Sequence, residues 1–331
     1  MRWLLGIYIC ACLFASAGAR AEQDEAALKN SLRDVVSAAW RAQDMAQVER
    51  LAEEFRTTRA MSSTGAWKSR LLHRALWEDV ERAALQGESW SSIRERSAHW
   101  ARVARDVPIA QISYAAVIEL QAWSVRGHGY ASTVSAENMR TFGRLMHESG
   151  DYLDAVKDKA ASDPEWYAAK LRCAWQGRTS NEEVWALLVE ATAREPGYIP
   201  TFYSAMEGFT SRWGGSDDLL EAFIRKAAPL AGKLEEQAYA RLYTRVIQSR
   251  TLAHFASSKV DCDRVVRGIK AFIVAYPDPL NLNLASRAAG ACGDKAFALK
   301  LIERIGENPM AEVWGTPPAN AFEGLKRWAS Q

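Results

Sequence analysis

The chain has 331 residues with 42 Lys and Arg against 40 Asp and Glu, so its formal net charge is only +2 at pH 7. A balance this close to neutral argues against proteins that bind nucleic acid through a bulk basic surface. Hydrophobic residues make up 48% of the chain and no Gly/Ser/Pro-rich linker divides it, so we expect one continuous body with a large core.

Residues 1–21 have the pattern of a cleaved signal peptide. Arg2 gives a positive start, an apolar run follows from Trp3 to Phe14, and Ala19-Arg20-Ala21 supplies a small-x-small motif. The run is about twelve residues long, too short to span a bilayer. We therefore predict cleavage after Ala21 and a periplasmic or secreted protein. An uncleaved anchor and a lipoprotein attached at Cys12 are the less favoured alternatives.

Residues 22–134 are predicted to form an N-terminal helical block. Apolar residues recur at the i, i+3, i+4, i+7 spacing of an amphipathic helix, for example over 28–39 and 48–55. A long helix from Pro108 should end near Arg126, where Gly127-His128-Gly129 follows. That Gly-x-Gly comes after a helix and lacks a third glycine, so it predicts a helix stop and not a dinucleotide loop.

Residues 135–331 are predicted to continue as helical hairpins. Pro164 and Pro196 stand 32 residues apart, as do Pro277 and Pro309, and each proline lies between helical runs. A period in the low thirties with paired helices is typical of tetratricopeptide stacks. The 81 residues from Pro196 to Pro277 are not a whole multiple of 32. We therefore predict an all-α, tetratricopeptide-like α-solenoid of stacked helical hairpins with degenerate repeats.

Helix starts in this half carry recognisable caps. Ser180 with Glu183 fits a capping box, and Ser216 precedes two aspartates. Asp163-Pro164 and Asp278-Pro279 each place an acid before a proline, which is favourable at the first helical position. These sites fix where we expect several helices to begin.

The chain lacks any spacing that predicts catalysis, a cofactor or a metal. No nucleophile elbow, Cys-x-x-Cys or phosphate-binding Gly-Lys-Ser/Thr loop is present. His147, Glu148, Asp151 and Asp154 lie within two helical turns, but we expect Gly150 to interrupt the helix between them. A solvated helix end is therefore favoured over a metal site.

Cysteine usage agrees with export. Cys262 is expected at the start of one helix and Cys292 at the end of the next, positions that meet in an antiparallel hairpin. An oxidising compartment would bridge them, so we predict a Cys262–Cys292 disulfide; two buried thiols are the alternative. Cys173 is predicted to be a small core residue.

Aromatic residues are concentrated in two successive hairpins. Most are expected to be packing residues, because helix–helix interfaces are built from such side chains. A minority could line a concave groove for a protein or peptide. The candidates for that partner groove are Trp166, Tyr167, Tyr198, Tyr203 and Trp213.

Several patches resemble a family of uncharacterised bacterial exported proteins defined by a domain of unknown function with tetratricopeptide-like helices. The resemblance covers about residues 30–250 and implies a helical fold, but it does not identify any catalytic residues. The matching patches are Gly65-Ala66-Trp67-Lys68, Ala122-Trp123, Arg126-Gly127-His128-Gly129-Tyr130-Ala131, Asp163-Pro164-Glu165-Trp166-Tyr167, Glu195-Pro196-Gly197-Tyr198 with Pro200 and Tyr203, and Arg212-Trp213-Gly214-Gly215-Ser216.

Three functions remain open from the sequence. The favoured one is a scaffold that binds a protein or peptide in the bacterial envelope, without nucleic acid and without a membrane span in the mature chain. The second is an enzyme acting on cell-wall glycan, with Glu119 or Glu207 as the acid, which needs a raised pKa and a reachable cleft. The third is a structural module with no discrete ligand.

Overall fold

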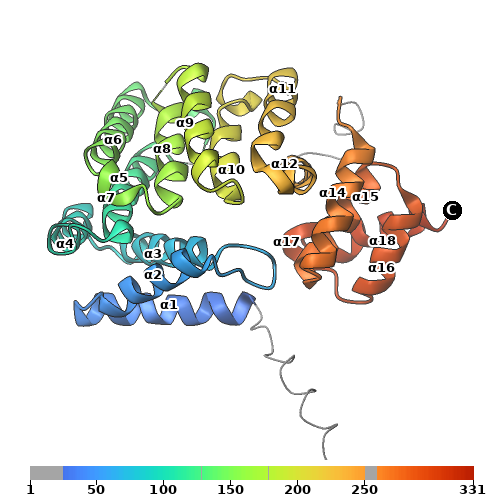
Figure 1. Ribbon diagram of the computed structural model, residues 1–331, viewed down its shortest axis with the longest axis horizontal. Coiled ribbons are helices and arrows are strands. Elements are labelled where there is room, and N and C mark those ends of the chain that lie inside the picture. The colour runs from blue at the N-terminus through green and yellow to red at the C-terminus, as the bar shows by residue number, and fades with distance from the viewer. Residues whose placement is uncertain (1–24, 128, 178, 250–258) are drawn as a thin grey trace, which may run out of the picture.

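The computed structural model describes residues 25–331 except 128, 178 and 250–258, and within these residues the regular structure is all helical (Figure 1). One isolated bridge between Met61 and Trp67 is the only strand-like pairing in that part of the chain. The predicted signal peptide lies outside the described residues. None of the described helices is long and apolar enough to cross a membrane.

The first half of the chain folds into helices, as predicted. The long helix from Pro108 ends at Arg126, as expected. The elements are α1 (Glu25–Ala42), α2 (Ala46–Thr58), α3 (Lys68–Leu85), α4 (Trp90–Val103), α5 (Pro108–Arg126), η1 (Ala131–Thr133), α6 (Ala136–Ala155) and α7 (Lys157–Ala160).

The second half continues in the same manner with shorter helices. The elements are α8 (Glu165–Gln176), α9 (Asn181–Arg194), α10 (Ile199–Glu207), η2 (Ser211–Trp213), α11 (Asp217–Ala227), η3 (Ala228–Leu234), α12 (Glu235–Ser249), α14 (Cys262–Ala275), α15 (Pro279–Ala291), α16 (Lys295–Ile305), α17 (Ala311–Trp314) and α18 (Pro318–Ala329).

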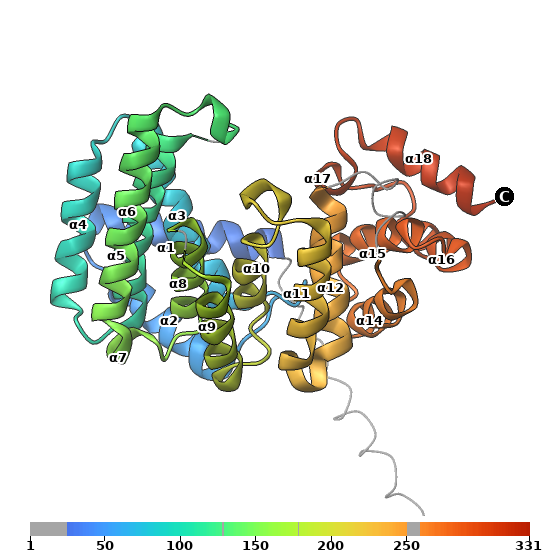
Figure 2. The ribbon, with the colours of Figure 1, turned by 90° about the horizontal axis from the view of Figure 1, so that it is seen from above.

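The helices follow one another along a curved path. In Figure 1, α1–α3 lie along the lower edge, α4–α7 at the left, α8–α12 along the top and α14–α18 at the right. Figure 2 shows α4 to α12 as a row, with α14–α18 at the opposite end from α4. Each helix packs mainly on its near neighbours in sequence: α5 on α6, α12 on α14 and α15 on α16. Second neighbours such as α1 and α3, or α8 and α10, also touch.

The apolar core is divided among clusters that share helices along this array. One cluster of buried side chains joins α1–α5, a second joins α5 to α6 and α8, and a third extends from α8 to α18. Ile112 of α5 and Phe142 of α6 belong to the same cluster, on either side of residue 134. The N-terminal block and the following hairpins therefore share a core at their junction.

Three of the four predicted caps form. Ser180 and Glu183 make a reciprocal capping box, the Ser216 hydroxyl accepts from the Leu219 N–H, and Asp278 caps the helix that begins at Pro279. The fourth differs by one residue: α8 begins at Glu165, so Pro164 occupies the cap position and not the first helical position, although the Asp163 carboxylate accepts from the Glu165 N–H (2.9 Å). The prediction that Gly150 interrupts a helix is wrong. α6 runs through Gly150, which is buried and has no positive φ, and a Cβ there would make only an ordinary contact with Cys173 of α8 (3.5 Å).

The loop of residues 59–67, between α2 and α3, reaches the far end of the chain. The Ser63 hydroxyl donates to the Asp278 carboxylate (2.6 Å), and the Asn281 side chain donates to the Thr64 carbonyl (3.1 Å). Gly65 has φ +72° and lies against the Tyr276 ring, where a Cβ would come within 2.7 Å of a ring carbon. Only glycine combines this backbone conformation with so close an approach. The loop therefore ties the first helices to α15 (Figure 1).

The predicted cysteine pair comes together at the α14–α15 hairpin. Cys262 starts α14 and Cys292 follows the end of α15, and their sulfurs lie at disulfide distance with Cα atoms 5.2 Å apart. That Cα separation lies within the usual range for a disulfide. Cys173 is buried, as predicted, and its thiol donates to the Ser149 hydroxyl (3.4 Å).

Candidate functional site

Three of the five aromatics predicted for a partner groove are inside the core, so that prediction is wrong for them. Trp166, Tyr167 and Tyr198 are at most 1% exposed. Their polar tips are hydrogen bonded internally: the Trp166 indole donates to the Leu153 carbonyl (2.9 Å) and the Tyr167 hydroxyl to Glu190 (2.9 Å). A ring whose polar tip has an internal partner can be buried at little cost, which is why these residues anchor helices.

Tyr203 and Trp213 are half-buried but do not share a surface. Tyr203 lines a cleft beside α12, whereas Trp213 packs edge-on against Trp123 (5.8 Å between ring centroids) and Trp175 (4.5 Å). The five residues therefore do not form one groove, and the two that reach the surface belong to different places.

A buried charge network surrounds Glu165 at the start of α8. The Glu165 carboxylate is fully buried and accepts from Arg70 of α3 (2.5 Å), from Arg172 about two helical turns further on (3.1 Å), and from the Tyr198 hydroxyl (2.6 Å). Because three donors converge on one carboxylate, its charge is compensated without water.

The network extends to neighbouring helices through the same residues. Arg172 donates through Nε to both Glu119 oxygens of α5 (3.0 and 3.1 Å). His73 of α3 is hydrogen bonded to Asp163 (3.0 Å between Nε2 and Oδ2). The Trp77 ring lies near the guanidinium groups of Arg70 (4.4 Å) and Arg172 (4.8 Å). The network thus joins α3, α5, α8 and α10 by charged hydrogen bonds.

Electrostatics keep Glu165 ionised in the folded protein. Burial alone would raise its pKa, but the attraction of Arg70 and Arg172, with His73 nearby and the Tyr198 hydrogen bond, lowers that pKa to about 2. Glu165 also raises the pKa of Tyr198, adding to the effect of burial on that hydroxyl. The carboxylate is therefore a fixed anion and not a group that exchanges protons near neutral pH.

This depressed pKa predicts a loss of stability in acid. Glu165 should contribute about 3 kcal/mol above pH 4.5, the ordinary value, and this contribution should disappear as the pH falls from there to about 2. Urea unfolding at several pH values between 6 and 2.5 checks it in wild type and Glu165→Gln. The gap in unfolding free energy between the two should shrink as the pH falls, and a gap independent of pH would contradict the assignment.

The two acids considered for glycan hydrolysis are engaged in ion pairs. Glu119 is 8% exposed and bonded to Arg172, and Glu207 lies 4.0 Å from Arg245. Neither lines either of the clefts described below. A general acid needs a reachable cleft and a raised pKa, so no feature of these two sites favours the enzyme hypothesis.

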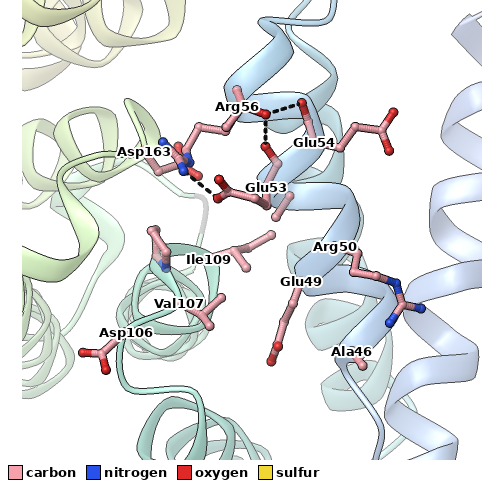
Figure 3. A pocket seen from close by; sticks show the side chains of 13 residues that line it. Ala46, Glu49, Arg50, Glu53, Glu54, Arg56, Asp106, Val107, Ile109 and Asp163 are labelled. Atoms are coloured by element: carbon pink, nitrogen blue, oxygen red, sulfur yellow. Dashed lines mark hydrogen bonds and ion pairs between the residues drawn. The ribbon is translucent and has the colours of Figure 1, made fainter.

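The larger cleft, which we call the acidic cleft, lies between α2 and the start of α5 (Figure 3). Its volume is about 630 Å³, and its walls include Glu49, Glu53, Asp106 and Asp163. These carboxylates already have partners: Glu49 accepts from the Trp100 indole, Glu53 pairs with Arg56, Asp106 with Lys159 and Asp163 with His73. The charges of this cleft thus serve contacts within the protein.

Another, smaller cleft, which we call the central cleft, is bounded by the 59–67 loop and by α10, α12, α14 and α15. Its volume is about 190 Å³, room for one or two side chains and less than a typical small-molecule site. Apolar side chains of α14 and α15 line one side, and Arg241 and Arg245 of α12 line another. The apolar residues are Ile269, Phe272, Ile273, Leu280, Leu284 and Ala285.

The two arginines of the central cleft are weakly engaged. The Arg241 guanidinium lies over the Phe272 ring (4.7 Å), and in the part of the chain that the structure describes it forms no ion pair. The Arg245 side chain is 56% exposed, and Glu207 at 4.0 Å is a distant partner. Three of the floor residues are buried, and Phe272, Leu280 and Leu284 are partly exposed. Such a floor beside two weakly engaged cations suits a segment that combines an apolar side chain with a carboxylate.

The residues described hold no group of three or more His, Cys, Asp or Glu side chains arranged for a metal ion. Of the four residues weighed for such a site, Glu148 pairs with Arg94 and Arg144, and Asp154 with Lys170. These carboxylates therefore act in ion pairs along α6.

The sequence did not predict the arginines and the histidine of these sites. One signal was present: Arg70, His73 and Trp77 share a face of α3 that also carries buried apolar residues. A basic residue on a buried stripe needs an anionic partner, but its identity comes only from the fold.

Comparison with protein-family models, curated proteins and solved structures gives no match to this chain. The family resemblance drawn from the six patches therefore stays a prediction, and the site rests on its own geometry.

Proposed function

We propose that this chain is an exported, tetratricopeptide-like scaffold of the bacterial envelope that binds a segment of another protein in the central cleft. The segment would place an apolar side chain on the α14–α15 floor and an Asp or Glu carboxylate against Arg241 and Arg245. The observation that carries the proposal is this pairing of a partly exposed apolar floor with two weakly engaged cations.

The arrangement of helices supports the repeat architecture. Contacts between first and second neighbours in sequence, as in α1 with α3 and α8 with α10, are what a stack of hairpins produces. Such stacks characteristically bind partners along their inner curve. The signal-peptide pattern and the cysteine pair at disulfide distance support export to an oxidising compartment.

The charge of the cleft decides which partner is favoured. A basic segment would be repelled by Arg241 and Arg245, whereas an acidic one would neutralise them at a surface already partly shielded from water. The small volume favours an extended segment that inserts one side chain over a folded domain that inserts many.

A displayed random-peptide library, selected on the purified mature protein, tests this proposal. Enriched peptides should pair an apolar residue with a neighbouring Asp or Glu. Their affinity, measured by fluorescence anisotropy, should fall at least about tenfold in the Arg241→Glu/Arg245→Glu variant, because a close charge pair becomes a repulsive one.

The matched control reverses two exposed cations of α16, Lys300→Glu and Arg304→Glu, which change the net charge equally outside the cleft. That variant should keep the affinity within about threefold, since exposed charges act weakly at physiological salt. Peptides that show no acidic preference, or that bind both variants equally, would count against the central cleft as the site.

A further inference from the structure

Arg126, the last residue of α5, is a buried cation enclosed by aromatic rings. Its side chain is 7% exposed, and its guanidinium carbon lies 5.2 Å from the Trp123 ring, 5.2 Å from the Trp213 ring and 5.7 Å from the Phe142 ring. Trp175 packs edge-on against Trp213 from α8. Rings on several sides stabilise a cation partly, but they give its N–H groups no acceptor.

No carboxylate meets Arg126 among the residues that the structure describes. Its only hydrogen bonds there run from Nη1 to the Gly127 carbonyl (2.9 Å) and the Gly129 carbonyl (3.2 Å), and its buried Nε–H has no partner. The buried Arg172, by contrast, has both Glu119 and Glu165. Burial lowers the pKa of Arg126, and the nearby charge of Arg212 lowers it further. An unpaired buried charge is costly, so a site for an anion would explain it.

The unused part of the guanidinium has a defined shape. Since Nη1 is held by two carbonyls, the edge formed by Nε–H and one Nη2–H remains. These two N–H bonds point in the same direction and match the two oxygens of a carboxylate. The Trp175 indole N–H is likewise buried without a partner, so a second orphaned donor belongs to a residue that touches Trp213.

We propose that Arg126 is the anchor of a second ligand site, which takes the carboxylate of a small ligand whose flat or apolar body lies against Trp213. Trp213 is half-buried and forms the outer wall, and the exposed Arg212 adds positive charge at the rim. None of these residues lines the central cleft, so this site is independent of the proposed peptide site. A free peptide C-terminus and an acidic sugar both offer this chemistry.

Thermal unfolding of the mature protein with two matched pairs of probes tests the proposal. The pairs are glucuronate against glucose, and an acetylated tripeptide acid against its amide, each at 10 mM and equal ionic strength. A carboxylate probe present at ten times its Kd should raise Tm by about 2 °C, and its neutral counterpart should not. The pair that responds identifies the source of the carboxylate. If neither carboxylate exceeds its neutral counterpart, the site is refuted.

Variants separate binding from a structural role. Arg126→Met should abolish the carboxylate-dependent shift yet leave Tm of the free protein unchanged or higher, because it removes an unpaired buried charge. Arg126→Lys keeps the positive charge but lacks the paired N–H donors of the guanidinium. The affinity of this variant for the carboxylate probe should therefore fall at least about tenfold. Arg264→Met is the matched control: Arg264 also lies over an aromatic ring (4.2 Å from the Tyr239 ring centroid), but its Nε and Nη2 already donate to Glu236 and Glu235. A carboxylate-dependent shift that survives in Arg126→Met overturns the assignment.

Discussion

Replacing Glu165 with alanine should lower the free energy of unfolding by about 3–5 kcal/mol, the range seen when one partner of a buried ion pair is removed. The change leaves Arg70 and Arg172 facing an empty, fully buried site and leaves the Tyr198 hydroxyl without its acceptor. Arg172 keeps Glu119, so one of the two cations retains a partner. Urea unfolding at pH 7, followed by circular dichroism, measures the difference.

The matched control is Asp154→Ala, which also removes a carboxylate bonded to a cation. Asp154 pairs with Lys170 (2.6 Å), but its side chain is 57% exposed. Water screens such a pair, so its loss should cost less than about 1 kcal/mol. If Glu165→Ala also costs less than about 1 kcal/mol, the network is not what joins α3, α5, α8 and α10.

Local sequence was a good guide to the helices because the interactions that start and stop them are local. Ser180 reaches Glu183 within one turn, and Asp278 caps the helix that Pro279 opens. The Cys262–Cys292 pairing was equally accessible, since two adjacent antiparallel helices bring the start of one beside the end of the other. In each case the partners are fixed by one helix or one hairpin.

The candidate sites depend on partners far apart in sequence, which periodicity cannot identify. Arg70 and Glu165 are separated by 95 positions, and Ser63 and Asp278 by 215. The prediction that aromatic residues line a partner groove was wrong for the same reason. Trp166 and Tyr198 have the composition of a binding surface, but only the packing of α8 against its neighbours decides that they are buried.

Arg126 is a residue whose surroundings the local sequence does not indicate at all. The sequence marks it only as the end of a helix before Gly127, and an arginine there is ordinary because cations favour helix C-termini. Its enclosure by Trp123, Phe142 and Trp213 requires residues from three elements. A buried cation of this kind is therefore found from side-chain packing and not from spacing.

Removing the Cys262–Cys292 bridge should lower the free energy of unfolding by about 2–4 kcal/mol, because a cross-link over 30 positions restricts the unfolded chain. The Cys262→Ala/Cys292→Ala double variant and the reduced wild-type protein should lose similar amounts in urea unfolding. Cys173→Ala is the control, since Cys173 forms no bridge and its loss removes only one small buried thiol.

Counting free thiols tests whether the Cys262–Cys292 disulfide forms in the cell. The mature chain predicted from Glu22 onward has three cysteines. Protein prepared without reductant from an envelope extract and then denatured should show one free thiol, Cys173, and three after reduction. Cys173 should not react with a thiol reagent before denaturation. Burial, with Glu119 nearby, raises its pKa to about 12 and suppresses the reactive thiolate. Three free thiols without reductant would mean that the bridge does not form in the cell, and the cysteine argument for export would fail with it.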